Sequence, residues 1–493
     1  MLILGLGWTS YVHFAAPILP FDDAYITYRH VDNFVAGNGP VYNPGERIFG
    51  CSTPLYFIWL ASLKFVTGMD LPMLAVRSNA LWYAMSCAGC MALLFRLSGS
   101  YGLAALGGGF LCMDRSQLAI STGGMESFLF VSLALGCLIA CTYRQPFLTG
   151  TLLGFAILAR LEGICLLPVI FLVYRPRQLL RAVFSCCIVL GLWVVPALLY
   201  FGTAVPHSIK AKAAPLYILP WFQGAFTCLS QLGREFAWDF ASRHFTSRLS
   251  LAEGALIVGL IAAGGLIQAA RNPRGLVAAA PAVFVLGVIA MYGVANTLIA
   301  DWYFPSVIVA ALVACLLAIH AVARMLPHAA AGWPLSVVVT TSLAVAWVVF
   351  ASIRPSAGEH LRLVSPMQMA REDAARLRVV TYLRCAEWLN QHAGRGDVVA
   401  APEIGGFGFA YRGPILDPCG LVSPQAIPYL PSQGALLPEF IAATRPKWIV
   451  TMPIFASTLL ASQWFNDQYQ LESSFELPVV AYQSREVLIY RLR

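Results

Sequence analysis

The sequence predicts an all-α polytopic membrane domain followed by a small α/β domain outside the membrane. Of the 493 residues, 59% are hydrophobic and only 11% are charged, and the mean hydropathy is +0.71. Apolar segments of roughly 17 to 25 residues recur along the chain, separated by short loops marked by Arg or by Gly and Pro. Barrel strands would instead alternate polar and apolar residues over short segments, so membrane-crossing helices are favoured.

The membrane domain is predicted over residues 1–353. Its first apolar run, 1–19, lacks a basic start and a small-residue cleavage site, so we expect a span rather than a cleaved signal peptide. We expect about eleven spans, over 1–19, 72–95, 101–113, 127–143, 147–160, 163–174, 182–201, 252–270, 276–299, 304–323 and 333–353.

Charges at the ends of these spans predict their orientation. Alternate ends carry arginines without acidic residues, which is typical of the cytoplasmic side. These are Arg96, Arg144, Arg175, Arg177, Arg181, Arg271, Arg274 and Arg324. The apolar segment 53–66, "TPLYFIWLASLKFV", is short for a span, and counting it as one would invert the pattern. We therefore expect it to lie along the outer interface, with the acidic residues gathered on the same face.

Residues 20–68 form the first outer loop in this topology. In "DAYITYRHVDNFV" one helical stripe predicts a juxtamembrane helix that lies flat on the membrane. The stripe consists of Ala24, Thr27, Tyr28, Val31, Phe34 and Val35. Glycines and prolines between residues 37 and 45 then predict a compact loop before the second juxtamembrane helix at 53–66.

Residues 354–493 have the pattern of an α/β domain outside the membrane. A charged helix is predicted over 371–392, followed by the strand-like runs "DVVAAPEI", "KWIVTM", "PVVAYQ" and "VLIYRL". Cys385 and Cys419 fall in this domain, and an oxidising compartment would allow a disulfide, although the sequence leaves their pairing open. The thirteen Cys residues show no metal-ligand spacing.

Two adjacent carboxylates, Asp22 and Asp23, follow the first span in "LPFDDAYITYRH". One Asp there would cap the following helix by accepting hydrogen bonds from free backbone N–H groups. A second carboxylate adds repulsion that holds one pKa up, which suits a proton acceptor or the partner of a cation at the mouth of a cavity. Both interpretations remain open from these residues alone.

Two further motifs place ionisable residues near the outer ends of spans. In "STGGMES", Glu126 stands just before an apolar run resumes, and a capping box with Ser121 or Thr122 is the alternative to a functional role. In "LARLEG", Arg160 and Glu162 interrupt one long apolar segment. They either face a polar cavity or pair with each other in a turn.

Cations and aromatic rings are predicted at the same face. "PHSIKAK" brings together His207, Lys210 and Lys212. This set suits an anionic lipid headgroup, or else it begins a solvated interfacial helix. "ADWYFP" joins two spans by a short outer turn with Asp301, Trp302 and Tyr303. An aromatic belt at the membrane interface explains these rings, and aromatic faces also stack on sugars.

These groups together predict the chemistry of the outer face. A carboxylate would accept the proton of an attacking hydroxyl, while a cation would stabilise a leaving phosphate. The combination fits sugar transfer from a lipid phosphate. No glycine-rich nucleotide loop is present in the sequence, which argues against a nucleotide-sugar or ATP donor. The net charge of +8 is explained by topology, because no basic run with interleaved aromatics indicates nucleic acid.

Four motifs resemble those of bacterial GT-C glycosyltransferases related to the mycobacterial terminal arabinofuranosyltransferase. They are, in order, "FDDAYITYRHVDNFVAGNGPVYNPGERIFGCSTPLY", "STGGMES", "LARLEG" and "PHSIKAK". The resemblance covers residues 20–212 by motif and the rest by layout, and Leu161 stands where relatives have Pro. It implies transfer of a sugar, D-arabinofuranose by expectation, from decaprenyl- or undecaprenyl-phosphate to a cell-envelope glycan or glycoprotein. The expected place is the bacterial inner membrane, with the site and the C-terminal domain facing the periplasm.

The resemblance also implies roles for individual residues. Asp22 is the expected catalytic base, with Asp23 next, and Glu126 orients acceptor or donor hydroxyls. The donor phosphate is expected at Arg160, Glu162, His207, Lys210 and Lys212. The acceptor or its sugar is expected at Tyr25, Asp301, Trp302 and Tyr303. We expect no cofactor and no metal ligand; a divalent cation is compatible with the sequence but not indicated by it.

A transporter or flippase of lipid-linked sugar is the main alternative, because Arg160, Glu162 and Asp301 would also suit a translocation path. Two features count against it: the sequence shows no inverted repeat, and the acidic residues gather on one face. A noncatalytic scaffold whose C-terminal domain binds wall glycan would leave the gathered carboxylates unexplained.

Overall fold

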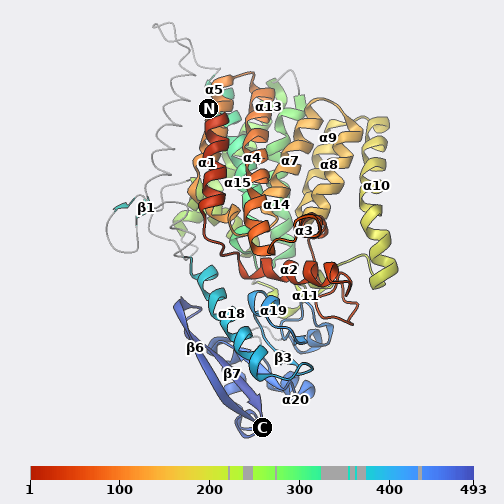
Figure 1. Ribbon diagram of the computed structural model, residues 1–493. Helices are drawn as coiled ribbons and strands as arrows, with labels where there is room; N and C mark the ends of the chain where they lie inside the picture. Colours follow the sequence, from red (N-terminus) through yellow and green to blue (C-terminus); the bar gives the residue numbers. More distant parts are fainter. Residues whose placement is uncertain are drawn as a thin grey trace.

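The computed structural model describes residues 2–219, 223–236, 248–271, 275–323, 354–355, 361–362, 373–430 and 436–493. A bundle of apolar helices stands on two helices, α2 and α3, that lie across its foot, and the C-terminal domain follows below them (Figure 1). The N-terminus lies at the end of the bundle away from the C-terminal domain (Figure 1). The chain is therefore mostly helical with a small C-terminal sheet domain, as the sequence predicts.

The helices of the bundle coincide with predicted spans, with bounds that shift by several residues at most. They are α1 (Leu2–Ala15), α4 (Leu71–Ser98), α5 (Tyr101–Met113), α7 (Ser127–Thr142), α8 (Pro146–Ala159), η1 (Leu161–Leu166) with α9 (Leu167–Val173), α10 (Pro176–Phe201), α13 (Arg248–Arg271), η3 (Gly275–Ala279) with α14 (Ala280–Ala295), and α15 (Pro305–Ala323). The predicted span 333–353 lies outside the described residues, and the domain boundary placed after it stays a prediction.

Four apolar helical stretches in the described part of the chain are long enough to cross a membrane. They are Leu71–Ser98, Pro176–Phe201, Leu276–Ala295 and Pro305–Val322. Glycines end two of these helices and α3, because Gly68, Gly99 and Gly202 take the left-handed conformation after the last turn. The long helices therefore stop where the sequence supplies a residue without a side chain.

Short elements connect the long helices, and the sequence indicated only one of them, the helix that starts at His207, as an alternative. They are α6 (Arg115–Ser121), α11 (His207–Ala211), η2 (Pro215–Tyr217), α12 (Gln223–Phe236) and η4 (Asp301–Tyr303). Helix α6 begins at Asp114, whose carboxylate accepts hydrogen bonds from the backbone N–H groups of Ser116 and Gln117 at 2.9 and 3.2 Å. It leads into the "STGGMES" loop, which α2 and α3 hold from below.

Helices α2 (Asp22–Val35) and α3 (Pro54–Thr67) form where the two juxtamembrane helices are predicted. Helix α2 lies across the foot of the bundle and the C-terminal domain packs on its other side through α19; that α2 lies flat on a membrane stays a prediction. Tyr28 of the predicted stripe is buried, but so are Arg29 and His30 outside it, whereas Phe34 and Val35 at the end of the stripe are exposed. Helix α2 is thus an internal layer between the bundle and the C-terminal domain.

The C-terminal domain packs helices on a five-stranded sheet of order β4-β3-β5-β7-β6. Its strands are β3 (Val399–Ala400), β4 (Ile415–Leu416), β5 (Trp448–Thr451), β6 (Tyr469–Ala481) and β7 (Ser484–Leu492). Strand β3 pairs in parallel with β4 and β5, while β7 pairs antiparallel with β5 and β6. The strands β1 (Arg354–Pro355) and β2 (Leu361–Arg362) form a separate pair.

The helices of this domain are α18 (Ala374–His392), α19 (Gly406–Ala410), η5 (Pro424–Tyr429), α20 (Pro438–Thr444), η6 (Pro453–Ala456), α21 (Ser457–Leu460) and α22 (Gln463–Gln468). Helix α18 and strands β3, β5 and β7 match predicted elements. Strand β6 is much longer than the predicted run, and β4 was not predicted. Cys385 and Cys419 are both free thiols.

Arg29 joins the first outer loop to the C-terminal domain. Its buried guanidinium donates to the carbonyls of Tyr42 at 2.7 Å, Tyr411 at 2.9 Å and Gly413 at 2.9 Å, and also to that of Gly408 and to the side-chain oxygen of Asn43. One planar cation therefore satisfies five acceptors from two segments far apart in the sequence.

We expect Arg29→Ala to lower the free energy of unfolding by roughly 3 kcal/mol, because the buried acceptors lose their shared donor. Arg29→Lys keeps the charge but lacks the planar fork, so it should restore only part of the loss. Thermal unfolding of the full chain in detergent measures both variants. An unchanged melting temperature in Arg29→Ala would show that the joint does not depend on this side chain.

Candidate active site

Asp22 and Asp23 lie in the same first turn of α2 but face different partners. The buried Asp22 carboxylate accepts hydrogen bonds from the backbone N–H groups of Gly405 at 3.1 Å and Gly406 at 2.8 Å. An added Cβ on Gly405 would collide with Asp22, so glycine is required for this close approach. Asp22 therefore caps the start of α19 in the C-terminal domain rather than its own helix.

The Asp23 carboxylate accepts no hydrogen bond from any residue that the structure describes, and the residue is only partly buried. Burial raises the pKa of this carboxyl, the charge of Lys212 lowers it, and the neighbouring Asp22 raises it again. The net direction is upward from the usual 3.8. A carboxylate with free lone pairs and a raised pKa is suited to accept a proton.

Lys212, at the end of α11, is a cation whose charge lowers the pKa of the Asp23 carboxyl. Its Nζ donates to the Tyr303 hydroxyl at 2.7 Å and lies 5.4 Å from the centre of the Tyr303 ring. Burial opposes the charge of Lys212, but Tyr303 and Asp23 outweigh it and raise the pKa of the ammonium. Lys212 is therefore held as a cation, and the charge of Asp23 contributes to this.

Arg160 packs on the same Tyr303 ring. Its guanidinium carbon lies 4.2 Å from the centre of the Tyr303 ring. Arg160 Nη1 donates to Glu126 at 2.6 Å, and its Nη2 and Nε donate to Glu162 at 2.8 and 3.0 Å. Tyr292 donates to the same Glu162 oxygen at 2.6 Å. All of these charged groups are buried, so their mutual pairing is what makes their burial tolerable.

This network resolves the alternatives that the sequence left open for Glu126 and Arg160. Ser121 and Thr122 donate to carbonyls of their own helix, so no capping box with Glu126 forms. Arg160 and Glu162 do pair with each other, but Glu126 joins them from 34 residues away. Because carboxylates already occupy the Arg160 guanidinium, the geometry favours a positioning role for Arg160 over direct contact with a phosphate.

The other predicted site residues are distributed more widely. Trp302 packs its ring 4.8 Å from that of Phe21, next to Tyr303. His207 lies at the start of α11 and Lys210 is exposed on the same short helix. Asp301 is exposed at the turn before Trp302. Tyr25 is buried between Tyr28 and Phe409, so the structure does not present its ring to an open surface as a sugar-binding role would require.

Sequence reasoning missed Arg378 and Glu403, which the C-terminal domain contributes to the same region. Arg378 Nε donates to Glu403 at 2.6 Å. Burial raises the pKa of Glu403 to about 7, Arg378 opposes the shift, and Asp22 and Asp23 add to it. The only sequence feature that pointed to them is their charge in an otherwise apolar chain, because their position depends on how the two domains meet.

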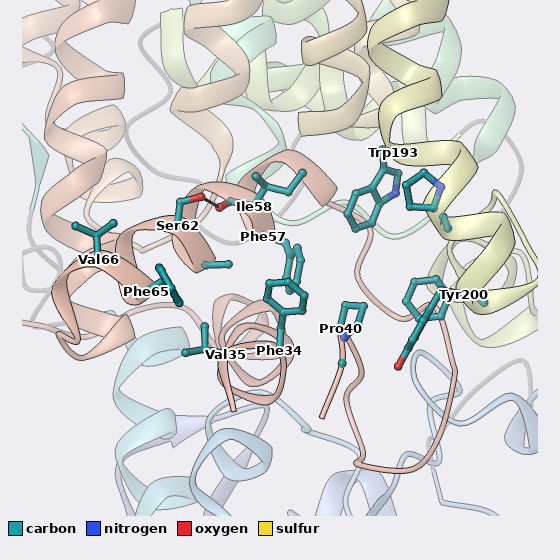
Figure 2. Close-up of a pocket in the computed structure, with 15 residues that line it drawn as sticks. Phe34, Val35, Pro40, Phe57, Ile58, Ser62, Phe65, Val66, Trp193 and Tyr200 are labelled. Atoms are coloured by element: carbon teal, nitrogen blue, oxygen red, sulfur yellow. Dashed lines mark hydrogen bonds between the residues drawn. The ribbon is translucent and has the colours of Figure 1, made fainter. Parts of the chain in front are cut away.

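An apolar groove runs from the foot of the bundle along α3 and α10 (Figure 2). Its volume is about 950 Å³. Figure 2 shows Phe34 of α2 and Phe57 and Phe65 of α3 on one side, with Trp193 and Tyr200 of α10 on the other. The groove is open and its lining is almost wholly hydrocarbon or aromatic, so it is suited to an apolar chain.

Comparisons with known proteins place the fold. A family model described as a domain of unknown function (DUF8728) matches residues 368–490, which include α18 and the five-stranded sheet. The sequence has no match among curated proteins. The structure is similar to ArnT from Cupriavidus metallidurans bound to undecaprenyl phosphate, with a TM-score of 0.59 and 12% identity over 99% of this chain and 97% of that one.

Two solved structures from Archaeoglobus fulgidus are also similar. One is an oligosaccharyltransferase in complex with Zn and sulfate, with a TM-score of 0.56 and 12% identity over 99% of this chain and 72% of the other. The second is the oligosaccharyltransferase AglB with an inhibitory peptide and a dolichol-phosphate, with a TM-score of 0.53 and 12% identity over 99% and 73%. At such identities the likeness is one of fold. The chain has a GT-C-like fold, shared with membrane glycosyltransferases.

We expect Asp22→Ala to lower the free energy of unfolding by about 1–2 kcal/mol, because two N–H groups at the start of α19 lose their acceptor. Asp23→Ala, one residue along the same helix, should leave stability nearly unchanged because Asp23 caps nothing in the described structure. Thermal unfolding of the two variants side by side tests the difference. Equal losses would contradict the division of roles between these neighbours.

Proposed function

We propose that the protein is a membrane glycosyltransferase that moves a sugar from a polyprenyl-phosphate donor to a cell-envelope glycan or glycoprotein. The observation that carries this proposal is Asp23, a carboxylate that accepts no hydrogen bond in the described structure, together with Lys212, which is hydrogen-bonded to Tyr303 and whose charge influences Asp23. The GT-C-like fold supports it, because ArnT was solved with undecaprenyl phosphate and AglB with a dolichol-phosphate. D-Arabinofuranose as the sugar, and the periplasmic face of a bacterial inner membrane as the location, rest on the motif resemblance.

In the proposed reaction, Asp23 accepts the proton of the acceptor hydroxyl as that oxygen attacks the anomeric carbon. The bond between the anomeric carbon and the phosphate oxygen breaks, and polyprenyl phosphate leaves with the bonding electrons. Lys212 stabilises the charge that develops on this phosphate. Tyr303 holds the Lys212 ammonium in place by its hydroxyl, and the Arg160 guanidinium packs on the Tyr303 ring.

We favour a different residue as the catalytic base from the one that the motif resemblance implies. Each carboxylate oxygen of Asp22 accepts a hydrogen bond from a backbone N–H group, one from Gly405 and one from Gly406. The Asp22 carboxylate is held against backbone groups of the C-terminal domain, whereas the Asp23 carboxylate accepts no hydrogen bond in the described structure; we therefore favour Asp23 as the base and give Asp22 a positioning role. Glu126 and Glu162 are favoured as partners of Arg160 rather than as contacts to sugar or phosphate.

The apolar groove is the proposed site for the isoprenoid chain of the donor. It is lined by Phe34 and Val35 at the last turn of α2, roughly 16 Å along the helix from Asp23 in the first turn, and by α10, whose end precedes the segment that carries Lys212. An isoprenoid laid between α3 and α10 would bury apolar surface there, at roughly 25 cal/mol per Å² removed from water. The headgroup would then lie at the foot of the bundle, where the charged groups are.

We expect Asp23→Asn to reduce sugar transfer by roughly 10²- to 10⁴-fold while the protein stays folded. The assay follows release of decaprenyl phosphate from decaprenyl-phosphoryl-D-arabinofuranose by the purified full chain in detergent. Asp22→Asn serves as the matched control and should lose far less activity. Full turnover by Asp23→Asn together with loss in Asp22→Asn would restore Asp22 as the base. Translocation of the intact lipid-linked sugar in liposomes, with no decaprenyl phosphate released, would support the flippase.

The pH dependence provides a second test of the same pair. Transfer requires ionised Asp23, so kcat/KM should fall as the pH drops through its raised pKa, at a midpoint above the ordinary 3.8. Because Lys212 lowers that pKa, Lys212→Met should move the midpoint to higher pH. A midpoint that stays in place in Lys212→Met would mean that the two groups do not interact during turnover.

We expect Ser62→Trp to obstruct the groove, because Ser62 is an exposed residue of its lining on α3. The KM for a decaprenyl donor should rise on the order of tenfold, which corresponds to about 1.4 kcal/mol. A short-chain analogue with two isoprene units should be affected much less. Leu199→Trp places the same ring on an exposed position of α10 outside the groove and should change neither KM. Equal effects on long and short donors would place the lipid elsewhere.

A further inference from the structure

The turn between β6 and β7 has an unusual backbone for its sequence. Ala481 pairs with Ser484, so Tyr482 and Gln483 form a two-residue loop, and both have positive φ values of +47° and +63°. Such loops favour Asn and Gly, since other residues pay about 1–2 kcal/mol each for the left-handed conformation. A large aromatic side chain held in a strained turn points to a role for that side chain.

The Tyr482 ring extends from this turn toward charged residues of the candidate active site. The Arg378 guanidinium lies 5.1 Å from the ring centre, and Arg378 is itself paired with Glu403 at 2.6 Å. The Phe455 ring lies 5.6 Å away. Two neighbours thus hold the ring in position, yet 52% of the residue remains exposed. The ring is fixed but not covered.

The turn lies at the end of the hairpin nearest the bundle, because the C-terminus at the end of β7 marks the far end (Figure 1). The charged groups that shift the pKa of Tyr482 are consistent with a turn near the bundle. Burial raises the pKa of the Tyr482 phenol to about 12, Arg378 opposes the shift, and Glu403, Asp23 and Asp22 add to it. The charge of the proposed base, Asp23, therefore contributes to the raised pKa of this phenol.

We propose that Tyr482 is the stacking platform for the sugar ring of the acceptor. This proposal rests on the proposed function, since it assigns the acceptor side of the same site. A sugar presents apolar C–H groups on its face and hydroxyls at its edge. Tyr482 offers a half-exposed aromatic ring, and the buried Arg378–Glu403 pair holds that ring in position. An acceptor ring stacked there would approach Asp23 from the C-terminal domain.

The acceptor is favoured over the donor sugar because of where the two apolar features lie. The groove proposed for the donor lipid is formed by α2, α3 and α10, while Tyr482 belongs to the C-terminal domain. A donor attached to a lipid in the groove would bring its phosphate to Lys212 on the bundle side. Tyr482 then remains for the substrate that arrives from the other side of Asp23.

The test measures binding of methyl α-D-arabinofuranoside, methyl α-D-mannopyranoside and methyl β-D-galactopyranoside to the full chain in detergent by saturation-transfer difference NMR. Wild type and Tyr482→Phe, which keeps the ring, should saturate the ring protons of at least one glycoside. Tyr482→Ala should lose the effect, with a rise in dissociation constant on the order of tenfold. Gln483→Gly relaxes the neighbouring strained residue without removing the ring, so it should bind as wild type does and unfold at the same or a higher temperature.

Failure of this proposal is distinguishable from failure of the proposed function. Each variant is also tested for binding of decaprenyl phosphate, which should not depend on Tyr482. Equal glycoside binding in wild type and Tyr482→Ala, or binding of no glycoside by wild type, would overturn the platform while lipid binding upheld the donor site. In turnover assays Tyr482→Ala should raise the KM for the acceptor and leave the KM for the donor in place. A rise in donor KM alone would assign the ring to the donor sugar and overturn the proposal.

Discussion

The buried guanidinium of Arg29 is the interaction on which the arrangement of the candidate site depends. A cation without partners in this position would carry a large desolvation cost, which five acceptors from the outer loop and the C-terminal domain offset. Most of these acceptors are backbone carbonyls, so the contact requires a defined path of the chain around α19. Once Arg29 fixes that path, Gly405 and Gly406 meet Asp22, and Arg378 and Glu403 come to the foot of the bundle. The part of the candidate site that Arg378, Glu403 and the Asp22 contacts form therefore requires the C-terminal domain to be docked on α2.

Helix geometry explains how two adjacent carboxylates come to differ. Successive residues on an α-helix point about 100° apart, so Asp22 and Asp23 cannot face the same surface. Asp22 faces the C-terminal domain, where two backbone N–H groups donate hydrogen bonds to its carboxylate. Asp23 accepts no hydrogen bond in the described structure, and the charge of Lys212 lowers its pKa. Asp22 still acts on its neighbour, because its fixed charge helps to raise the pKa of Asp23. The pair thus combines the two roles that the motif left open, with the structural role on one residue and the chemical role available to the other.

The sequence predicted the features that local patterns encode. Hydropathy located the long helices, the stripe in α2 located a juxtamembrane helix, and short strand-like runs located β3, β5 and β7. The missing parts all depend on contacts between distant segments. The burial of Arg29 depends on carbonyls more than 370 positions away, and the choice between Asp22 and Asp23 depends on where Gly405 docks. The pairing of Glu126 with Arg160 joins two motifs that each allowed a purely local explanation. Strand β4, only two residues long, is too short for any alternation to show.

The charge of Lys212, which influences the proposed base and is assigned to the proposed leaving group, has a consequence for charge balance. A polyprenyl-phosphate sugar is a phosphodiester with one negative charge, and the released monoester carries up to two. Asp23 loses one negative charge when it accepts the proton, so the reaction moves charge from Asp23 to the phosphate while the total stays constant. Arg160 cannot supply the balancing cation, because Glu126 and Glu162 already neutralise it. Lys212 is the cation that interacts with Asp23 before transfer and is placed to interact with the phosphate afterwards. A single fixed cation that serves both ends of the charge shift needs little reorganisation, which is the condition under which electrostatic stabilisation of a transition state is most effective.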